Sequence, residues 1–353
     1  MVNPLAYSYD LPNSLIAQVP AIPRDASKLL IYNTRTNEIK TDYFYNIATY
    51  LPPSTTLTLN DAKVVPARVT LTKETGGKIV ALFLINEWIT QSSGPIPCFF
   101  DRKARVGDRL FFTDKSFVTV QKQEEGLFFV SWDGTAKDIL QKLDTYGTMP
   151  IPPYIKHSPL SRDELLEKYQ TTFAKKAGSS AAPTASLHFT KRVFNSLHAK
   201  GIQTKYITLH VGLGTFAPLT PENIQTKTLH HEWYEVPDDT RLFLEQSIST
   251  HTTADITAVG TTVVRTLESI CRYAKEDERR QRGETTLFIS PPYQFKAVKH
   301  LITNFHLPSS SLMMLVDAFL DYKKAPKRIG ELYEYAKKNS FRFYSFGDAM
   351  LIL

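Results

Sequence analysis

Three histidines lie in stretches whose residue types suit proton transfer at a bound ligand. His188 follows the small, polar run of "SSAAPTASLHFTKR" (179–192), His210 precedes a glycine-rich turn, and His306 lies in "TNFHLPSSS". An unperturbed imidazole titrates close to neutral pH, so each ring can serve as a base or as an acid. A lone histidine is a weak indicator, and His188 can equally cap or pack beside a helix that begins near Thr190.

Glycines and threonines at predicted strand ends suit the binding of an anionic group. In "HVGLGTF", Gly212 and Gly214 permit close backbone approach, but the third glycine of a dinucleotide loop is absent, and a plain tight turn also fits. Gly260, Thr261 and Thr262 open a predicted helix, whose free N–H groups can hold a carboxylate or a phosphate. An ordinary threonine N-cap, at Thr261 or Thr262, would give the same pattern.

The run "HHEWYEV" (230–236) lacks the spacing of a metal site. Adjacent side chains on a strand point to opposite faces, and the helical H-E-x-x-H pattern is absent. Glu232 and Tyr234 offer acceptors to a polar ligand, or belong to a solvated strand edge. Cys98 and Cys271 lie far apart in apolar surroundings, which argues against a disulfide framework or a thiolate zinc site. We therefore expect no metal.

Two patterns of secondary structure must position these residues. From about residue 64 to 132, short strand-like runs separated by glycine-containing turns predict a small all-β barrel. After the prolines at 150, 152 and 153, strands alternate with helices, which predicts an α/β domain. We expect an α/β main domain, residues 1–63 plus 151–353, with the barrel, residues 64–150, inserted in it or beside it. Ligands of open α/β sheets favour the carboxyl ends of the strands, where the polar stretches fall.

Composition narrows the class of protein without naming a reaction. The 353 residues suit two domains, and the 42% hydrophobic content allows sizeable cores. A net charge of +7 permits a polyanionic partner without demanding one. The first residues lack the pattern of a signal peptide, and no apolar run approaches the roughly 18 residues of a membrane span, so we expect a cytoplasmic protein without a membrane segment.

Nine motifs, taken in order, are highly specific although each alone is weak. They are "NDAKVVPAR", "GTMPIPPYI", "EKYQTTFA", "AAPTASLHFT", "TLHVGLGTF", "HEWYEV", "AVGTTVVRTLE", "LITNFHLPSSSLMMLVDAF" and "FRFYSFGDAML". In this order they resemble the S-adenosylmethionine:tRNA ribosyltransferase-isomerase family of queuosine biosynthesis, with matches from residue 9 to the last residues.

The resemblance implies an inserted barrel and an unusual reaction. The ribosyl part of S-adenosylmethionine would pass to the aminomethyl group of a 7-deazaguanine base at the tRNA wobble position. Epoxyqueuosine would form, and adenine and methionine would leave. S-adenosylmethionine would be a co-substrate and tRNA a partner, with no metal, and the enzyme would be a monomer. The catalytic candidates are His188, His210 and His306. The substrate-binding candidates are Asn60, Asp61, Arg68, Thr184, Gly212, Gly214, Thr215, Glu232, Tyr234, Gly260, Thr261, Thr262, Arg265, Asn304 and Asp348.

Several positions depart from the family's usual residues. They are Ala62, Val80, Ser179, Ser180, Ser186 and Pro292. Because some fall in predicted ligand loops, a diverged paralogue acting on another small-molecule or RNA acceptor is the first alternative. A non-catalytic tRNA-binding protein is the second, for which the basic charge would suffice.

Overall fold

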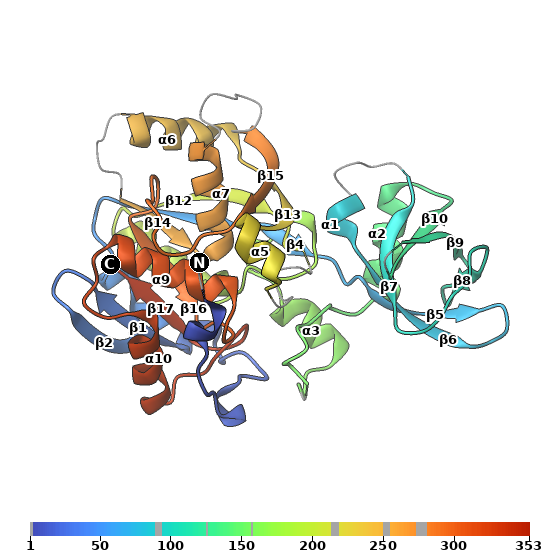
Figure 1. Cartoon of the computed structure of the whole chain (residues 1–353), viewed down its shortest axis with the longest axis horizontal. Coiled ribbons are helices and arrows are strands. Elements are labelled where there is room, and N and C mark those ends of the chain that lie inside the picture. Colours follow the sequence, from blue (N-terminus) through green and yellow to red (C-terminus); the bar gives the residue numbers. More distant parts are fainter. Residues whose placement is uncertain are drawn as a thin grey trace.

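The computed structural model shows a closed β-barrel extending from a large mixed sheet that carries helices (Figure 1). It describes residues 3–88, 94–124, 126–156, 158–212, 219–249, 255–272 and 281–353. The predicted fold class, an α/β main domain with an all-β barrel, is confirmed. No helix among these residues is both long and apolar enough to cross a membrane.

The main sheet places four parallel strands side by side. Its nine strands follow the order β15-β13-β12-β3-β14-β16-β17-β1-β2. Neighbours β12, β3, β14 and β16 run parallel, whereas β17 is antiparallel to β16. In chain order the strands are β1 (Lys28–Asn33), β2 (Glu38–Tyr43), β3 (Thr55–Asn60), β12 (Gln203–Leu209), β13 (Thr228–Glu235), β14 (Asp255–Val259), β15 (Arg282–Leu287), β16 (His300–Asn304) and β17 (Ala349–Ile352). Four carboxyl ends therefore meet at one edge of the sheet.

Both faces of the sheet are covered by apolar layers, because side chains alternate along each strand. On β1, Leu30 and Tyr32 join a core with α7 (Thr261–Arg272), α9 (Ser311–Tyr322) and α10 (Ile329–Lys338). Leu29 and Ile31 join a second core on the other face. That core includes residues of the 3-10 helix η4 (Phe44–Thr49) and of α4 (Lys191–Ala199).

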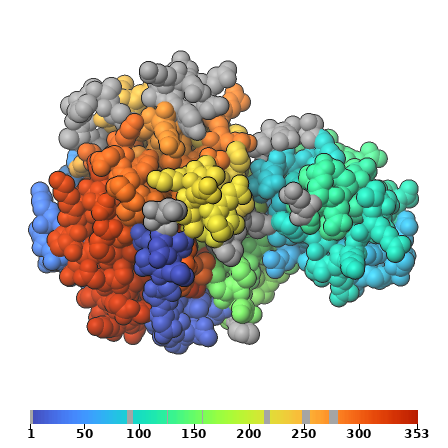
Figure 2. Space-filling view, in the orientation of Figure 1, coloured from blue at the N-terminus to red at the C-terminus, as the bar shows by residue number. Residues whose placement is uncertain are grey.

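The barrel forms a separate lobe in the space-filling view (Figure 2). Its strands follow the closed order β10-β7-β6-β5-β8-β9 around their own apolar core. Its elements are β5 (Arg68–Lys73), β6 (Lys78–Phe83), α1 (Ile85–Trp88), β7 (Ile96–Phe100), β8 (Arg109–Phe111), β9 (Phe117–Glu124), β10 (Leu127–Trp132) and α2 (Ala136–Tyr146). The boundaries at residues 64 and 150 stay predictions.

Short elements join the two parts. The capping-box spacing of Ser161 and Glu164 does begin a helix, α3 (Arg162–Lys168), in which Ser161 Oγ accepts from the Glu164 N–H. Strands β4 (Ala62–Val64) and β11 (Lys176–Ser179) form a small parallel sheet. The remaining elements are η1 (Pro4–Tyr7), η2 (Asn13–Leu15), η3 (Arg24–Ala26), η5 (Thr184–Ser186), α5 (Pro221–Thr226) and α6 (Asp238–Ser249).

Candidate active site

Several candidate residues lie at the carboxyl edge of the parallel strands. Asn60 ends β3, Gly260 follows β14, and Asn304 ends β16, while His210 follows β12. β17 starts at the same edge, since Ala349 pairs with Asn304. This is the edge at which open α/β sheets bind ligands.

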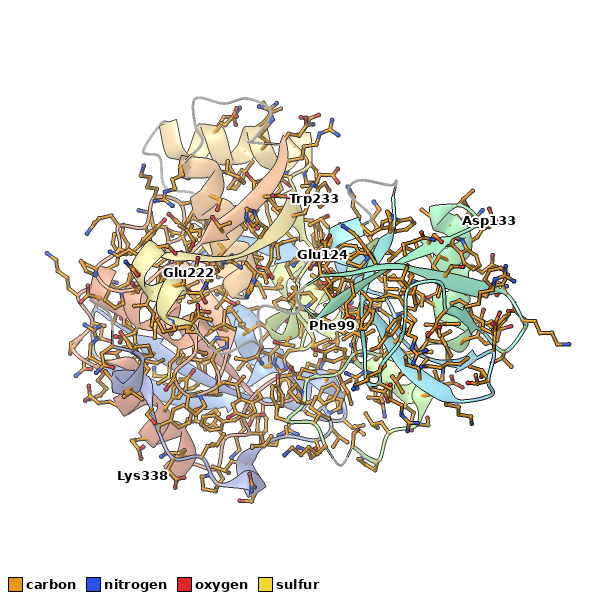
Figure 3. The ribbon with its side chains drawn as sticks, turned by 45° about the vertical axis from the view of Figure 1, so that its right-hand side comes forward. Phe99, Glu124, Asp133, Glu222, Trp233 and Lys338 are labelled. Atoms are coloured by element: carbon orange, nitrogen blue, oxygen red, sulfur yellow. The ribbon has the colours of Figure 1, made fainter. Side chains whose placement is uncertain are left out.

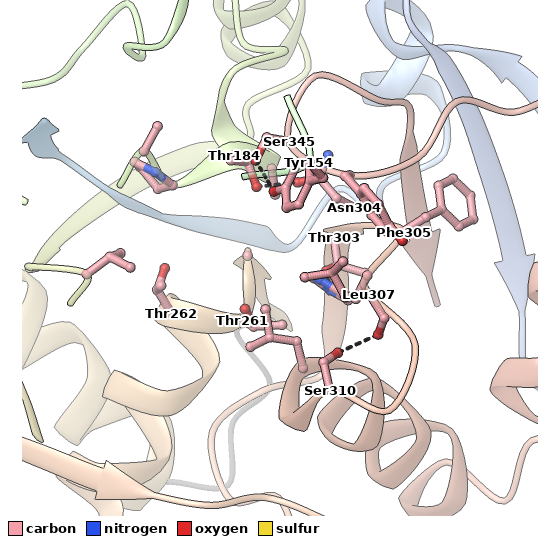
Figure 4. A pocket seen from close by; sticks show the side chains of 18 residues that line it. Tyr154, Thr184, Thr261, Thr262, Thr303, Asn304, Phe305, Leu307, Ser310 and Ser345 are labelled. Carbon is pink, nitrogen blue, oxygen red and sulfur yellow. Dashed lines mark hydrogen bonds between the residues drawn. The ribbon is translucent and has the colours of Figure 1, made fainter. Parts of the chain in front are cut away.

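A pocket opens at this edge, with about 690 Å³ of empty space that is partly open to solvent. Thr261 and Thr262 lie on one side of it and Thr184, Tyr154 and Ser345 on the other (Figure 4). No Lys, Arg, Asp or Glu occurs among its described lining residues, which are Tyr154, Ala182, Pro183, Thr184, Ala185, Val211, Gly260, Thr261, Thr262, Thr303, Asn304, Phe305, His306, Leu307, Ser310, Leu312, Tyr344 and Ser345. Its mostly apolar wall with a few polar groups is typical of small-molecule sites.

Two helices begin at the pocket. α7 begins at Thr261 itself, so Thr261 and Thr262 lie in its first turn and the predicted threonine N-cap is wrong; Gly260 precedes the helix with a φ of +93°. α9 follows Ser310, whose side chain accepts from the N–H of Met313. The free N–H groups of a first helical turn favour an anionic ligand group.

Asn304 links the pocket to His188. Its Oδ1 accepts from Thr184 Oγ1 at 2.8 Å, and its Nδ2 donates to the Asp348 carbonyl at 3.3 Å. The same Nδ2 lies 3.4 Å from His188 Nε2, so the neutral imidazole carries its proton on Nδ1, 2.8 Å from Ser27 Oγ. Burial lowers the pKa of His188 to about 4. His188 thus lies behind the pocket wall and reaches the pocket through Asn304.

His306 is the histidine that lines the pocket directly. Its Nε2 lies 2.8 Å from Thr303 Oγ1, and burial lowers its pKa to about 3. The ring is therefore neutral at physiological pH, so it is a hydrogen-bonding group in this state and not a proton donor.

His210 lies outside this pocket. Its ring stacks on Trp233 of β13, with centroids 5.4 Å apart and planes 13° apart, and Trp233 is labelled in Figure 3. Gly178 covers its edge so closely that a Cβ there would lie 2.9 Å from the ring. Burial lowers the pKa of His210 to about 4, and its buried Nδ1 has no hydrogen-bond partner among the described residues.

Glu232 and Arg265 contact each other and are both buried. The Arg265 guanidinium pairs with Glu232 Oε2 and also donates to the Leu287 carbonyl. Glu232 Oε1 accepts from the N–H of Gly212, at 3.1 Å. The pair therefore holds the start of the loop after β12, next to the pocket residue Val211. Tyr234, from the same strand as Glu232, is fully buried.

The barrel contacts the same loops through α1. Ser180 Oγ donates to Asn86 Oδ1 at 2.8 Å, and the Ser180 N–H donates to the Val211 carbonyl at 2.9 Å. A Cβ at Gly212 would lie 3.2 Å from Asn86 Nδ2. Asn86, Ser180 and Glu232 are all less than a tenth exposed. A buried polar network thus ties the barrel to both loops beside the pocket.

The remaining candidates have structural partners or lie elsewhere. Asn60 links β3 to β12 by accepting from the Leu209 N–H and donating to its carbonyl, and it reaches Thr262 Oγ1 at 3.4 Å. Asp61 accepts from Thr208 Oγ1, and burial raises its pKa. Asp348 accepts from the N–H groups of Lys28 and Arg342. Arg68 lies exposed on β5 of the barrel. Gly214 and Thr215 lie outside the described residues.

Several pocket residues carried no assigned role in the sequence reasoning. Tyr154 and Tyr344 pack with centroids 4.6 Å apart, and Tyr154 Oη lies 2.7 Å from Ser345 Oγ. Both tyrosines lie in motifs that the chain shares with the family, "GTMPIPPYI" and "FRFYSFGDAML". Neither motif alone indicates a binding role. Within the described residues, no group of three His, Cys, Asp or Glu side chains is arranged to hold a metal.

Comparison with known proteins gives one consistent family. The model of a family described as queuosine biosynthesis protein matches residues 5–352. A protein of Sulfurihydrogenibium sp. named S-adenosylmethionine:tRNA ribosyltransferase-isomerase is 39% identical over 98% of each chain, and one of that name from Nitratiruptor sp. is 41% identical over 100% of each. The crystal structure of an S-adenosylmethionine tRNA ribosyltransferase from Thermotoga maritima matches 98% of this chain and 99% of its own, with a TM-score of 0.53 and 32% identity.

Proposed function

The chain belongs to the queuosine biosynthesis protein family, and we propose that it acts as an S-adenosylmethionine:tRNA ribosyltransferase-isomerase through the pocket at the sheet edge. It transfers and isomerises the ribosyl part of S-adenosylmethionine onto the 7-aminomethyl-7-deazaguanine base at the tRNA wobble position. The product is epoxyqueuosine, and adenine and methionine are released.

The convergence of three parallel strand ends, those of β12, β14 and β16, and two helix starts in one pocket carries this proposal. The first turns of α7 and α9 suit the methionine carboxylate. Tyr154 and Tyr344 give an aromatic wall for the adenine ring and for the sulfonium, which aromatic faces attract. The sulfonium of S-adenosylmethionine loses its positive charge in the reaction. No Lys, Arg, Asp or Glu among the described lining residues opposes that loss.

Proton transfer in the pocket falls to His306. The reaction needs a base that removes the acidified proton from the carbon next to the sulfonium. We assign that role to His306 because it is the histidine among the described lining residues, with Thr303 orienting its ring. His188 orients Asn304 and Thr184, which face the ligand. We also propose that the enzyme needs no bound metal and works as a monomer in the cytoplasm, as the resemblance implies.

Adenine release tests this function. The protein is incubated with S-adenosylmethionine, with and without tRNA that carries the precursor base, and free adenine is measured. We expect release that depends on the tRNA and falls strongly in a Thr262→Ala variant. Thr240→Ala, which removes a buried hydroxyl on α6 outside the pocket, serves as the control. Equal release without tRNA would instead assign the chain to a small-molecule reaction.

A further inference from the structure

The barrel's excess of positive over negative side chains is concentrated in two segments. Residues 64–150 contain 11 Lys and Arg against 10 Asp and Glu, so the barrel as a whole is nearly neutral. The β5–β6 turn and the β7–β8 connection, residues 73–78 and 101–109, hold six of these cations and three of the acids. The rest of the barrel holds five cations and seven acids. We call the six cations the basic end: Lys73, Lys78, Arg102, Lys103, Arg105 and Arg109.

Contacts bring these two segments together. Lys73 pairs with Leu110 across the β5–β8 ladder, and its ammonium donates to the Lys103 carbonyl. A surface depression with about 810 Å³ of empty space, partly open to solvent, is lined by Lys73, Lys103, Arg105 and Arg109 together with Glu74, Thr75 and Asp108. Four of the six cations therefore share one surface, that of this depression.

Two of the three acids, Asp101 and Asp108, accept backbone hydrogen bonds, whereas two cations that line the depression have no side-chain partner among the described residues. Asp108 accepts from the Arg105 N–H at 2.9 Å, and Asp101 accepts from the Val80 N–H at 2.7 Å. The side chains of Lys103 and Arg105 are exposed and have no partner among the described residues. Exposed cations without counter-charges form an electrostatic footprint for an anion.

The position of the basic end selects the anion. The pocket lies in the α/β domain, and the β5–β6 turn lies at the far end of the barrel, along the long axis of the molecule (Figure 1). A single ligand that contacts both the pocket and the basic end must be long. It must also carry several negative charges, because the basic end presents several cations. We propose that the basic end binds the phosphate backbone of the substrate tRNA, away from the wobble base; this inference rests on the proposed function.

A double variant tests the surface without touching the pocket. Lys103→Gln/Arg105→Gln removes two unpaired cations, and Lys115→Gln/Lys137→Gln removes two other exposed charges of the same barrel outside the basic end. The Kd for precursor tRNA is measured over a range of KCl concentrations, together with the KM for tRNA and for S-adenosylmethionine.

We expect the first variant to raise the Kd and KM for tRNA roughly tenfold and to reduce the slope of log Kd against log salt by about two, because each phosphate contact contributes about 0.9. The KM for S-adenosylmethionine and the kcat at saturating tRNA should not change, and the Lys115/Lys137 variant should bind like the wild type. Equal tRNA binding by the two variants would overturn the inference. If the wild type binds tRNA but releases no adenine, the proposed function is refuted. The comparison of tRNA binding between the two variants would then still test the basic end.

Discussion

Removing Asn86, a barrel residue, should weaken the binding of S-adenosylmethionine in the other domain. Asn86→Ala leaves the buried Ser180 hydroxyl without its 2.8 Å acceptor, and Ser180 is 2% exposed. An unsatisfied buried polar group costs about 1–3 kcal/mol. Ser180 leads directly into the pocket residues Ala182, Pro183 and Thr184, so the loop can avoid this cost only by moving.

If the cost falls on the conformation that binds the substrate, the KM for S-adenosylmethionine rises by about 5- to 150-fold. Initial rates at saturating tRNA give this KM, and chemical denaturation gives the loss of stability. Thr240→Ala is the matched control, because its buried hydroxyl donates to the Tyr206 carbonyl at 3.0 Å, outside the pocket. We expect it to lower the free energy of unfolding and to leave the KM unchanged.

A double variant separates the hydrogen bond from a general loss of packing. Asn86→Ala/Ser180→Ala removes the orphaned hydroxyl as well as the acceptor, so its KM should lie closer to the wild type than that of Asn86→Ala. The reasoning fails if Asn86→Ala changes the KM no more than Thr240→Ala does, or if the two substitutions at 86 and 180 simply add.

Three further predictions concern buried groups near the site. Glu232→Gln leaves the Arg265 guanidinium buried without a counter-charge and should lower the free energy of unfolding by about 3–5 kcal/mol in urea titrations, so a loss below about 1 kcal/mol would contradict it. In Gly260→Ala the added Cβ would lie 3.7 Å from the nearest atoms, so it meets no close neighbour. The φ of +93° should nevertheless cost about 1–2 kcal/mol of stability and raise the KM for S-adenosylmethionine. An unchanged KM would show that the start of α7 does not bind the substrate. The free energy of unfolding should fall as the pH drops from about 6.5 toward 4, because in that range the unfolded chain binds protons at histidines that stay neutral in the fold. His188→Gln should reduce the slope of this free energy against pH by up to about 1.4 kcal/mol per pH unit. An identical slope would mean that His188 is protonated in the fold. The imidazoles concerned are those of His188 and His210, which are buried, and of His300 and His306, which are half-buried.

The architecture was largely predictable because its signals are local. The short apolar runs of "KLLIYN" and "HLITN", and the repeated turn glycines of the barrel, depend on residues a few positions apart. The capping box at Ser161 is equally local and begins a helix as predicted. Positions at or just after strand ends, such as Asn304 and Gly260, could be placed at the ligand edge for the same reason.

Pairings between distant segments could not be predicted in this way. Tyr154 reaches the pocket because the chain returns from the barrel beside Tyr344. In the sequence, Glu232 and Arg265 are two separate candidates for binding a substrate. In the fold, β13 and α7 lie close enough for the two side chains to form an ion pair with each other. His210 follows a strand that ends at the ligand edge, yet its ring packs against Trp233, outside the pocket.

Isotope transfer tests the central claim most directly. S-adenosylmethionine labelled with ¹³C in its ribose is incubated with the protein and precursor tRNA, and the wobble nucleoside is analysed by mass spectrometry. We predict that the five labelled ribose carbons appear together in epoxyqueuosine, with adenine and methionine released in equal amounts. A methylated nucleoside with S-adenosylhomocysteine, or an unlabelled wobble base, would contradict it.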